Sequence, residues 1–351
     1  MQLLQKIHSL NFSAGPSCLP RVVKDKLNHE LNKDISIFEI SHRHFKVLSL
    51  WDEVKFRLKS LLKIPDRFEI LYLPGGTRAQ IAPSLQNLKQ GPDGGGFLMT
   101  GYWARWAYKE AAQLNFNPTS LGLFQESLEE KKYSYIFYCD NETLSGSFFR
   151  IKHRGVQNTI ILDATSSFLC EEIDFNNHDI IIAGAQKNLG LAGGSIIIFD
   201  PELIQKNPII SSPFNYSKQL AMQSQATTPS ILNVFVMNEV LKWLEAQEDR
   251  LFLKKRRILA MELYNLIDKS NIYYSTIMSN FRSSVTITFN IAEDKYKILF
   301  DIELEKRGFF FLKAHQNFSD GYRISLYNAI VENSLEDLIV FLNEFEQSII
   351  R

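Results

Sequence analysis

The sequence predicts an α/β protein in which a large domain with a mainly parallel sheet is followed by a smaller α+β domain. Short apolar runs alternate with helical patterns between about residues 65 and 245, which is typical of parallel strands joined by helices. Several runs are apolar throughout, as expected for strands covered on both faces. After about residue 246 a long charged helical pattern precedes alternating strands. We expect an N-terminal segment near the site (1–15), a large domain (16–245) and a small domain (246–351).

The large domain contains six predicted strands and three predicted helices. The strands are Phe68–Leu73, Gly96–Met99, Tyr135–Tyr138, Thr159–Asp163, Ile180–Ala183 and Ser195–Phe199. The spacing of apolar residues predicts helices over Arg78–Leu88 and Trp103–Leu114. A third helix is expected to run to about Ala246, with Thr228 as its N-cap and Pro229 at its first position.

The small domain begins with a charged helix predicted over Asp249–Lys269. Alternating strands are predicted over Ser283–Phe289 and Tyr322–Tyr327. Ser334, followed three residues later by Asp337, predicts the N-cap of a last helix. Apolar residues follow on one face of that helix, at Leu335, Leu338, Leu342 and Phe345.

Composition excludes several classes of function. In 351 residues, 39 Lys and Arg balance 39 Asp and Glu, so the chain has no overall electrostatic footprint for nucleic acid or an anionic membrane. The three cysteines lack C-x-x-C spacing and predict neither a disulfide framework nor a zinc site, so no metal is expected. The N-terminus lacks a signal-peptide pattern, and no apolar run approaches the roughly 18 residues of a membrane span. We expect a cytoplasmic protein.

The most informative segment is the strand Ile180–Ala183 with the loop that follows it. The strand continues into Gly184-Ala185-Gln186-Lys187-Asn188, and a glycine-rich loop leads to the next strand. Desolvation disfavours a charged lysine, which lowers its pKa and frees the amine for Schiff-base chemistry. A surface lysine after a strand, with glycines that only turn the chain, would give the same pattern.

A second apolar strand, Thr159–Asp163, ends in an aspartate 24 residues before Lys187. Pyridoxal phosphate needs a carboxylate at its ring nitrogen and a lysine at its C4' carbon. Two adjacent strands ending at one sheet edge could supply both. An aspartate that caps the next helix is the alternative.

A third segment, Leu73-Pro74-Gly75-Gly76-Thr77-Arg78, joins a strand to a helix through a glycine turn. This arrangement presents backbone N–H groups and a positive helix end to an anion. It matches neither nucleotide-binding motif, and alone it is weak evidence for phosphate binding.

Specific motifs occur in order along nearly the whole chain. They are Asn11-Phe12-Ser13-Ala14-Gly15-Pro16, Glu39-Ile40-Ser41-His42-Arg43, Gly75-Gly76-Thr77-Arg78-Ala79-Gln80, Gly101-Tyr102-Trp103, Asn141-Glu142-Thr143, Asp163-Ala164-Thr165-Ser166-Ser167, Gly184-Ala185-Gln186-Lys187-Asn188 and Arg323-Ile324-Ser325-Leu326-Tyr327-Asn328. With these motifs the chain resembles the phosphoserine aminotransferases, in the class V group of fold-type I pyridoxal-phosphate enzymes. The resemblance implies transfer of the amino group of L-glutamate to 3-phosphohydroxypyruvate, giving O-phospho-L-serine and 2-oxoglutarate. The homologous phosphorylated substrate of vitamin B6 synthesis is also implied.

The resemblance also implies roles for individual residues. Lys187 would hold the cofactor and move the proton, and Asp163 would face the ring nitrogen. Further cofactor contacts would come from Thr77, Arg78, Trp103, Thr143 and Gln186. Ala226 and Thr227 would reach the cofactor phosphate of the other subunit, which implies a homodimer with shared active sites. Arg323 would hold the substrate carboxylate, while His42, Arg43, Arg78 and His315 would read its distal anion.

Three departures from the family pattern stand out. Ala226 replaces a usual asparagine, Gln316 replaces a basic residue after His315, and Ala79 replaces a common glycine. The alternatives are another class V enzyme, such as a small-amino-acid:glyoxylate aminotransferase or a desulfurase, and a non-catalytic homologue. A desulfurase would need a reactive cysteine on a mobile loop, and a non-catalytic homologue would be expected to lack Lys187 or Asp163.

Overall fold

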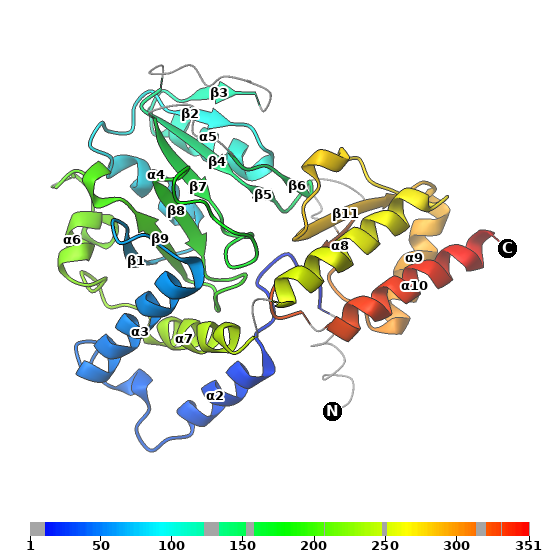
Figure 1. Ribbon diagram of the computed structural model, residues 1–351, viewed down its shortest axis with the longest axis horizontal. Helices are drawn as coiled ribbons and strands as arrows, with labels where there is room; N and C mark the ends of the chain where they lie inside the picture. Colours follow the sequence, from blue (N-terminus) through cyan, green and yellow to red (C-terminus); the bar gives the residue numbers. More distant parts are fainter. Residues whose placement is uncertain are drawn as a thin grey trace.

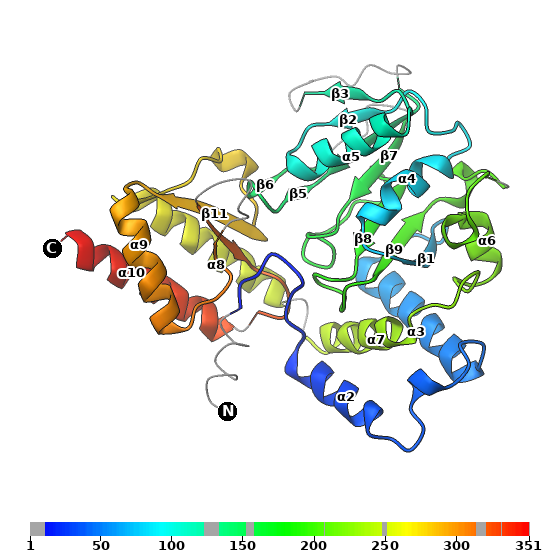
Figure 2. The same cartoon turned by 180° about the vertical axis from the view of Figure 1, so that it is seen from behind.

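A computed structural model describes residues 11–122, 133–151, 158–206, 208–247, 251–313, 321–330 and 332–350. The described strands form a seven-stranded, a three-stranded and a two-stranded sheet. Figures 1 and 2 show two lobes, a large one around the seven-stranded sheet and a small one around the three-stranded sheet. None of the described helices is long and apolar enough to cross a membrane.

The seven-stranded sheet has the order β1-β9-β8-β7-β4-β2-β3. Pairing is parallel from β8 through β7, β4 and β2 to β3, while β9 runs antiparallel to both β1 and β8. The prediction of a mainly parallel sheet is therefore confirmed. Its strands are β1 (Glu69–Pro74), β2 (Gly96–Leu98), β3 (Thr119–Leu121), β4 (Tyr135–Cys139), β7 (Thr159–Asp163), β8 (Ile180–Gly184) and β9 (Gly194–Phe199).

Helices cover both faces of this sheet, which explains the strands that are apolar throughout. In β8, Ile181 and Ala183 face one core, while Ile180 and Ile182 face the other. The first core includes side chains of α2 (Arg21–Leu31), α3 (Phe45–Leu62) and α7 (Ile231–Glu245). The second includes side chains of α4 (Arg78–Gln86), α5 (Tyr102–Gln113) and α6 (Tyr216–Ala221).

The small lobe packs three helices on an antiparallel sheet. The sheet has the order β10-β11-β12, and one buried apolar cluster fills the lobe. Its elements are α8 (Leu251–Lys269), β10 (Tyr273–Tyr274), β11 (Thr286–Ile291), α9 (Asp294–Arg307), β12 (Tyr322–Ser325) and α10 (Glu332–Ile350).

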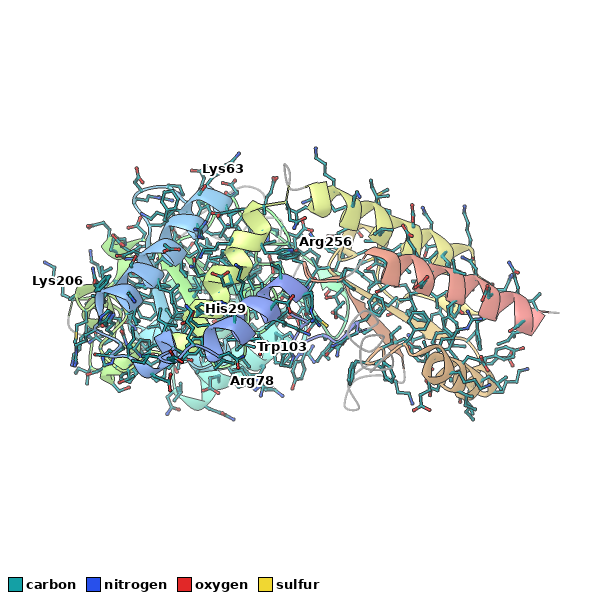
Figure 3. The ribbon with its side chains drawn as sticks, turned by 90° about the horizontal axis from the view of Figure 1, so that it is seen from below. His29, Lys63, Arg78, Trp103, Lys206 and Arg256 are labelled. Atoms are coloured by element: carbon teal, nitrogen blue, oxygen red, sulfur yellow. The ribbon has the colours of Figure 1, made fainter. Side chains whose placement is uncertain are left out.

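Polar contacts and the N-terminal segment join the lobes. Phe12 is fully buried in the small-lobe core, and its carbonyl accepts the Ser325 N–H at 3.2 Å. The short hairpin of β5 (Asn141–Glu142) and β6 (Ser147–Phe148) reaches from the large lobe to the small one. The carbonyl of Ser145 in its turn accepts the hydroxyl of Thr288 on β11 at 2.6 Å. Arg256 on α8 donates to Asn328 Oδ1 at 3.0 Å and to the Cys170 carbonyl, and it lies between the lobes in Figure 3.

Two predicted helix starts are wrong. α7 begins at Ile231, and its cap is Ser230, whose hydroxyl accepts the Asn233 N–H at 3.3 Å. Thr228 and Pro229 precede this helix because Ser230, whose own backbone is extended, supplies the capping oxygen. α10 begins at Glu332, so Ser334 lies inside its first turn and is not the cap.

Candidate active site

Two parallel strands bring the predicted lysine and aspartate to one edge of the large sheet. In the register of β7 against β8, Asp163 pairs with Ile182, and β8 ends two residues later at Gly184. Lys187 therefore follows β8 directly at the edge where β7 ends. The carboxyl ends of adjacent parallel strands are the usual place for a binding crevice in an α/β sheet.

A cavity of about 560 Å³ opens at this edge. Its lining comes from both lobes and from the N-terminal segment, including Ala14, Gly15 and Pro16. Every residue predicted to touch a cofactor or the substrate carboxylate within one chain lines it: Thr77, Arg78, Trp103, Thr143, Asp163, Gln186, Lys187 and Arg323.

Lys187 is half-buried, and its surroundings favour the neutral amine. Burial lowers the pKa of Lys187, while the nearby Asp163 carboxylate partly offsets that shift. The Ser17 hydroxyl donates to the Lys187 carbonyl, and the Ser17 N–H donates to the Gln186 carbonyl at 2.9 Å. These bonds fix the backbone on both sides of the lysine side chain, which packs against Gly15. A carbon added at Gly15 would lie 3.5 Å from Lys187 Cγ.

Asp163 is buried and held by a threonine two residues along the chain. Its Oδ1 accepts the Thr165 N–H at 3.0 Å and the Thr165 hydroxyl at 2.6 Å. Burial raises the pKa of Asp163, and the bonds from Thr165 together with Lys187 work against that rise. Because the Thr165 proton goes to Asp163, the Thr77 hydroxyl donates to Thr165 Oγ1 at 2.5 Å. Thr77 is therefore tied to the aspartate through one intermediate side chain.

Trp103, Thr143 and Arg323 form a chain of contacts across the cavity. The Trp103 indole N–H donates to the Thr143 hydroxyl at 2.9 Å. Arg323 Nη1 donates to the Thr143 carbonyl at 2.8 Å, while Arg323 Nε is buried without a hydrogen-bond partner. Since Arg323 belongs to β12 and Trp103 to α5, Thr143 links side chains from the two lobes.

The turn before α4 offers unused donors. Among the described residues, no hydrogen bond is made by the backbone N–H groups of Gly76, Thr77 and Arg78, while the Gly75 N–H donates to the Gly193 carbonyl at 2.9 Å. The Arg78 guanidinium lies 5.1 Å from the Trp103 ring centroid and 4.6 Å from that of Trp106, and Figure 3 shows Arg78 and Trp103 together. Free N–H groups at a helix start with an adjacent cation form a suitable anion site.

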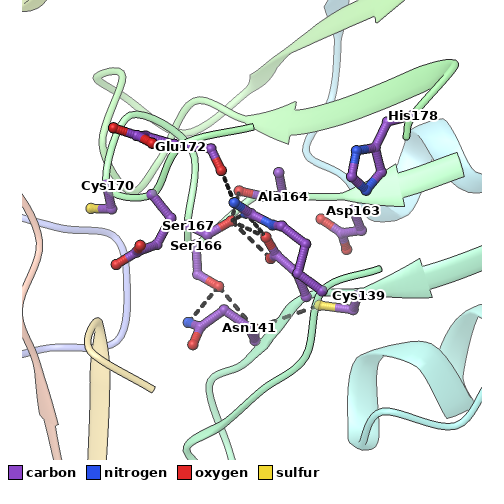
Figure 4. A network of polar contacts seen from close by, with 12 residues as sticks. Cys139, Asn141, Asp163, Ala164, Ser166, Ser167, Cys170, Glu172 and His178 are labelled. Carbon is purple, nitrogen blue, oxygen red and sulfur yellow. Dashed lines mark hydrogen bonds and ion pairs between the residues drawn. The ribbon is translucent and has the colours of Figure 1, made fainter. Parts of the chain in front are cut away.

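Several residues that support the site were not predicted individually. Beside Asp163, the Asn141 amide donates to Ser166 Oγ at 2.8 Å, and the Ser166 hydroxyl donates to the Asn141 carbonyl at 2.9 Å (Figure 4). Thr165 could have been found, because a hydroxyl two residues after an aspartate commonly bonds to it. Glu142 gave no comparable signal, since its partners lie about 40 positions away.

Five predicted residues are not placed in this cavity. His42, Arg43, Ala226 and Thr227 lie outside its lining. Arg43 is exposed, and the Ala226 N–H donates to Gln219 Oε1 at 3.2 Å. His315, like the Gln316 departure, falls outside the described residues.

Comparisons with known proteins identify the chain. Residues 9–337 match the class-V aminotransferase family, and the fold with its lysine–aspartate site accordingly defines a class-V aminotransferase. The chain is 32% identical to the phosphoserine aminotransferase of Legionella pneumophila (strain Corby), over 95% of this chain and 97% of that protein. It belongs to the phosphoserine aminotransferase family.

Solved structures agree over the same length. A phosphoserine aminotransferase from Bacillus circulans subsp. alkalophilus aligns with a TM-score of 0.91 at 30% identity, covering 97% of this chain and 99% of that one. A phosphoserine aminotransferase with bound pyridoxal phosphate, from Trichomonas vaginalis, aligns with a TM-score of 0.86 at 26% identity, covering 95% and 99%. The fold-type I prediction is therefore confirmed.

The residues present fit pyridoxal phosphate, which is the cofactor of this enzyme. Asp163 is a buried carboxylate that a protonated ring nitrogen would neutralise. Gln186 Oε1 is buried at the cavity without a hydrogen-bond partner, so it can accept from a polar ring substituent. The unused N–H groups of Gly76, Thr77 and Arg78 suit a phosphate.

Glu142 is expected to make the stability of the cofactor-free protein depend on pH. Burial raises the pKa of Glu142 from 4.5 to about 7, so the folded state binds a proton that the unfolded state releases in this range. The free energy of unfolding should therefore fall as pH rises from 4.5 to 7. Glu142→Gln should remove this contribution and gain roughly 3 kcal/mol relative to the wild type between pH 4.5 and 8. Urea unfolding of the wild type and the variant at pH 4.5 and at pH 8 measures this gain. A difference in unfolding free energy that is the same at both pH values would contradict it.

Proposed function

We propose that this enzyme transfers the amino group of L-glutamate to 3-phosphohydroxypyruvate, giving O-phospho-L-serine and 2-oxoglutarate. The observation that carries the proposal is that Lys187, Asp163 and Arg323 line the same cavity. The relatives named above support the substrate assignment. The homologous phosphorylated keto acid of vitamin B6 synthesis is a second substrate of the same chemistry.

Each side chain has a task in transamination. When bound, pyridoxal phosphate supplies an aldehyde for the amine and a ring that withdraws electrons from the substrate Cα. Burial lowers the pKa of Lys187, which favours the neutral amine, so Lys187 Nζ would be able to take the proton from the substrate Cα and deliver it to the C4' carbon of the cofactor. Asp163 would keep the proton on the ring nitrogen of the bound cofactor. Trp103 would stack on its ring, and Thr77, Arg78, Thr143 and Gln186 would hold its substituents and phosphate.

Arg323 is the residue that we infer to bind the substrate α-carboxylate. Its unpartnered Nε and its position at the cavity leave one edge of the guanidinium for a two-point contact. Its remaining Nη1 contact with the Thr143 carbonyl sets the direction of that edge. Lysine could replace the charge but not the planar fork.

The active site is proposed to be shared in a homodimer. His42 and Arg43 precede α3, on which Phe45 and Phe56 are exposed by 68% and 71%. Eleven residues make three helical turns, so both exposed rings lie on the same side of α3, where packing against a second copy would remove them from water. Such a copy would carry His42, Arg43, Ala226 and Thr227 to the partner's cavity. Sedimentation and activity measured on the same dilution series test this, because a fully active monomer would overturn it.

Arg43→Ala is expected to raise KM for glutamate and phosphoserine roughly tenfold or more, since a charged hydrogen bond to the distal anion is lost. The reaction with alanine, which lacks a distal anion, should change little. Lys46→Ala removes a neighbouring exposed cation and is the matched control. Equal losses with all three amino acids would show that Arg43 supports the fold instead. His42 and His315 are proposed to bind the same anion.

The assignment is tested by following the visible spectrum of the purified enzyme. Phosphoserine and glutamate should each change the spectrum, and 3-phosphohydroxypyruvate should restore it. Transfer from alanine to glyoxylate without any reaction of phosphoserine would favour the glyoxylate aminotransferase alternative. A desulfurase is disfavoured because burial raises the pKa of Cys139, Cys170 and Cys18, which leaves no activated thiolate among the cysteines.

We also infer the division into domains and the location. The separate apolar cores of the large and small lobes support domains 16–245 and 246–351, with residues 1–15 as a segment near the active site. Limited proteolysis tests this boundary. All three cysteines are free thiols, which suits the reducing cytoplasm.

A further inference from the structure

We propose that Glu142 is a positioning residue that fixes the ring of Trp103 at the cofactor cavity. This inference rests on the proposed stacking of Trp103 on the cofactor. Glu142 itself does not line the cavity. Its carboxylate bonds to the backbone of Trp103 and Ala104 in the first turn of α5.

Two oxygens of one carboxylate accept neighbouring backbone N–H groups. Glu142 Oε2 accepts the Trp103 N–H at 2.9 Å, and Oε1 accepts the Ala104 N–H at 3.0 Å. The Thr100 hydroxyl also donates to Oε1, at 3.3 Å. The partial positive charge of the helix start favours this anion. The carboxylate therefore fixes the backbone of the residue that carries the ring.

The same hairpin holds the other end of Trp103. Thr143, the next residue after Glu142, accepts the indole N–H at 2.9 Å. Backbone and ring of Trp103 are thus both bonded to adjacent residues of one short segment. Such a two-ended hold leaves the indole little freedom to rotate or to shift along the cavity wall.

The sequence makes room for this carboxylate at Gly101. A side-chain carbon added at Gly101 would lie 2.5 Å from Glu142 Cγ, so only glycine permits the approach. Gly101 is the N-cap of α5 and has no side chain to cap it. A serine or aspartate at this position would be the ordinary way to satisfy a helix start. The chain instead uses a carboxylate from a strand that lies beside the cavity.

This arrangement is unfavourable for stability alone. Glu142 is fully buried, and no ion pair with another described residue neutralises it. Asp163 is a second negative charge close enough to raise its pKa. A buried charge without a cation destabilises the folded state, and an ordinary capping residue would avoid that cost. Capping alone therefore does not explain Glu142, whereas a role in fixing the Trp103 ring does.

The test measures the affinity of the cofactor-free protein for pyridoxal phosphate in a double-mutant cycle. Above about pH 8, where Glu142 with its pKa of about 7 is ionised, Glu142→Gln should weaken binding roughly tenfold, because one of the two N–H groups then faces an amide donor. It should also reduce the induced circular dichroism of the bound cofactor at saturation. In the Trp103→Ala background, where the ring is absent, Glu142→Gln should change the dissociation constant less than about twofold.

Controls separate this effect from a loss of folding. Glu30→Gln alters another buried carboxylate that accepts a backbone N–H, that of Ile37 at 2.9 Å, and should leave cofactor affinity unchanged. Gly101→Ala is a second, independent variant: its added carbon displaces the same carboxylate, and it should give the same loss of affinity. Full affinity and normal circular dichroism in the Glu142 or Gly101 variant would overturn the proposal.

The outcomes also separate this proposal from the role of Trp103. An equal tenfold loss in both backgrounds would show that Glu142 acts other than through the ring, and would overturn the positioning role alone. Unchanged affinity in Trp103→Ala would instead reject the stacking itself, and the positioning role with it.

Discussion

Replacing Lys187 by alanine is expected to lower kcat for transamination by roughly 10⁴-fold or more while leaving a folded protein. The lysine is the only described amine lining the cavity, and burial lowers its pKa, which favours the neutral form that can accept a proton. Alanine fits the loop, whose shape is fixed by the Ser17 bonds to the backbone of Gln186 and Lys187. Single-turnover measurements with glutamate would report the loss in the chemical step.

Lys187→Arg is the matched control. It keeps a cation of similar length, but its guanidinium stays protonated and cannot accept the proton. It should therefore be as inactive as the alanine variant, and both should lack the covalent link to the cofactor, as seen in the visible spectrum and by mass spectrometry after borohydride reduction. Substantial turnover in either variant would reject the assignment of Lys187.

The pair of Lys187 and Asp163 could be predicted because it depends on local patterns. Two apolar strands each lead to a polar residue, Asp163 or Lys187. For these residues to meet, the strands need only be adjacent and parallel, as β7 and β8 are. The same residues also predicted that both faces of these strands are buried, since every position of both strands is apolar or terminal. The small domain's strands were predictable for the related reason that they alternate in polarity.

Other parts of the site depend on contacts between distant residues and were not predicted. Glu142 meets Trp103 through the packing of a hairpin against a helix, and the pattern of neither segment contains that contact. The N-terminal segment returns to the lobe junction, where the Tyr327 hydroxyl donates to the Ala14 carbonyl at 2.8 Å. The start of α7 was misplaced because Thr228, Pro229 and Ser230 all suit a helix start, and tertiary packing selects among them.

Asp163→Asn is expected to lower kcat by roughly 10³-fold or more, because a neutral amide cannot keep the ring nitrogen of the cofactor protonated. The change is nearly isosteric, and the Thr165 N–H and hydroxyl can still donate to the remaining oxygen. The amide group would then present donors to the cavity where the carboxylate presented an acceptor. Folding and the Thr77–Thr165 contact should survive, so the loss reports charge and not collapse.

The same substitution should also shift the titration of Lys187, and this second readout makes the test specific. Asp163 raises the pKa of Lys187 against the lowering effect of burial, so removing its charge should lower that pKa further. In the cofactor-free protein, Lys187 of the Asp163→Asn variant should therefore stay neutral, and reactive toward pyridoxal phosphate, to lower pH than in the wild type. Asp163→Glu, which keeps the charge, should retain the wild-type direction of the profile and recover part of the activity. An Asp163→Asn enzyme with near-normal kcat and an unshifted profile would show that this carboxylate neither faces the ring nitrogen nor acts on Lys187.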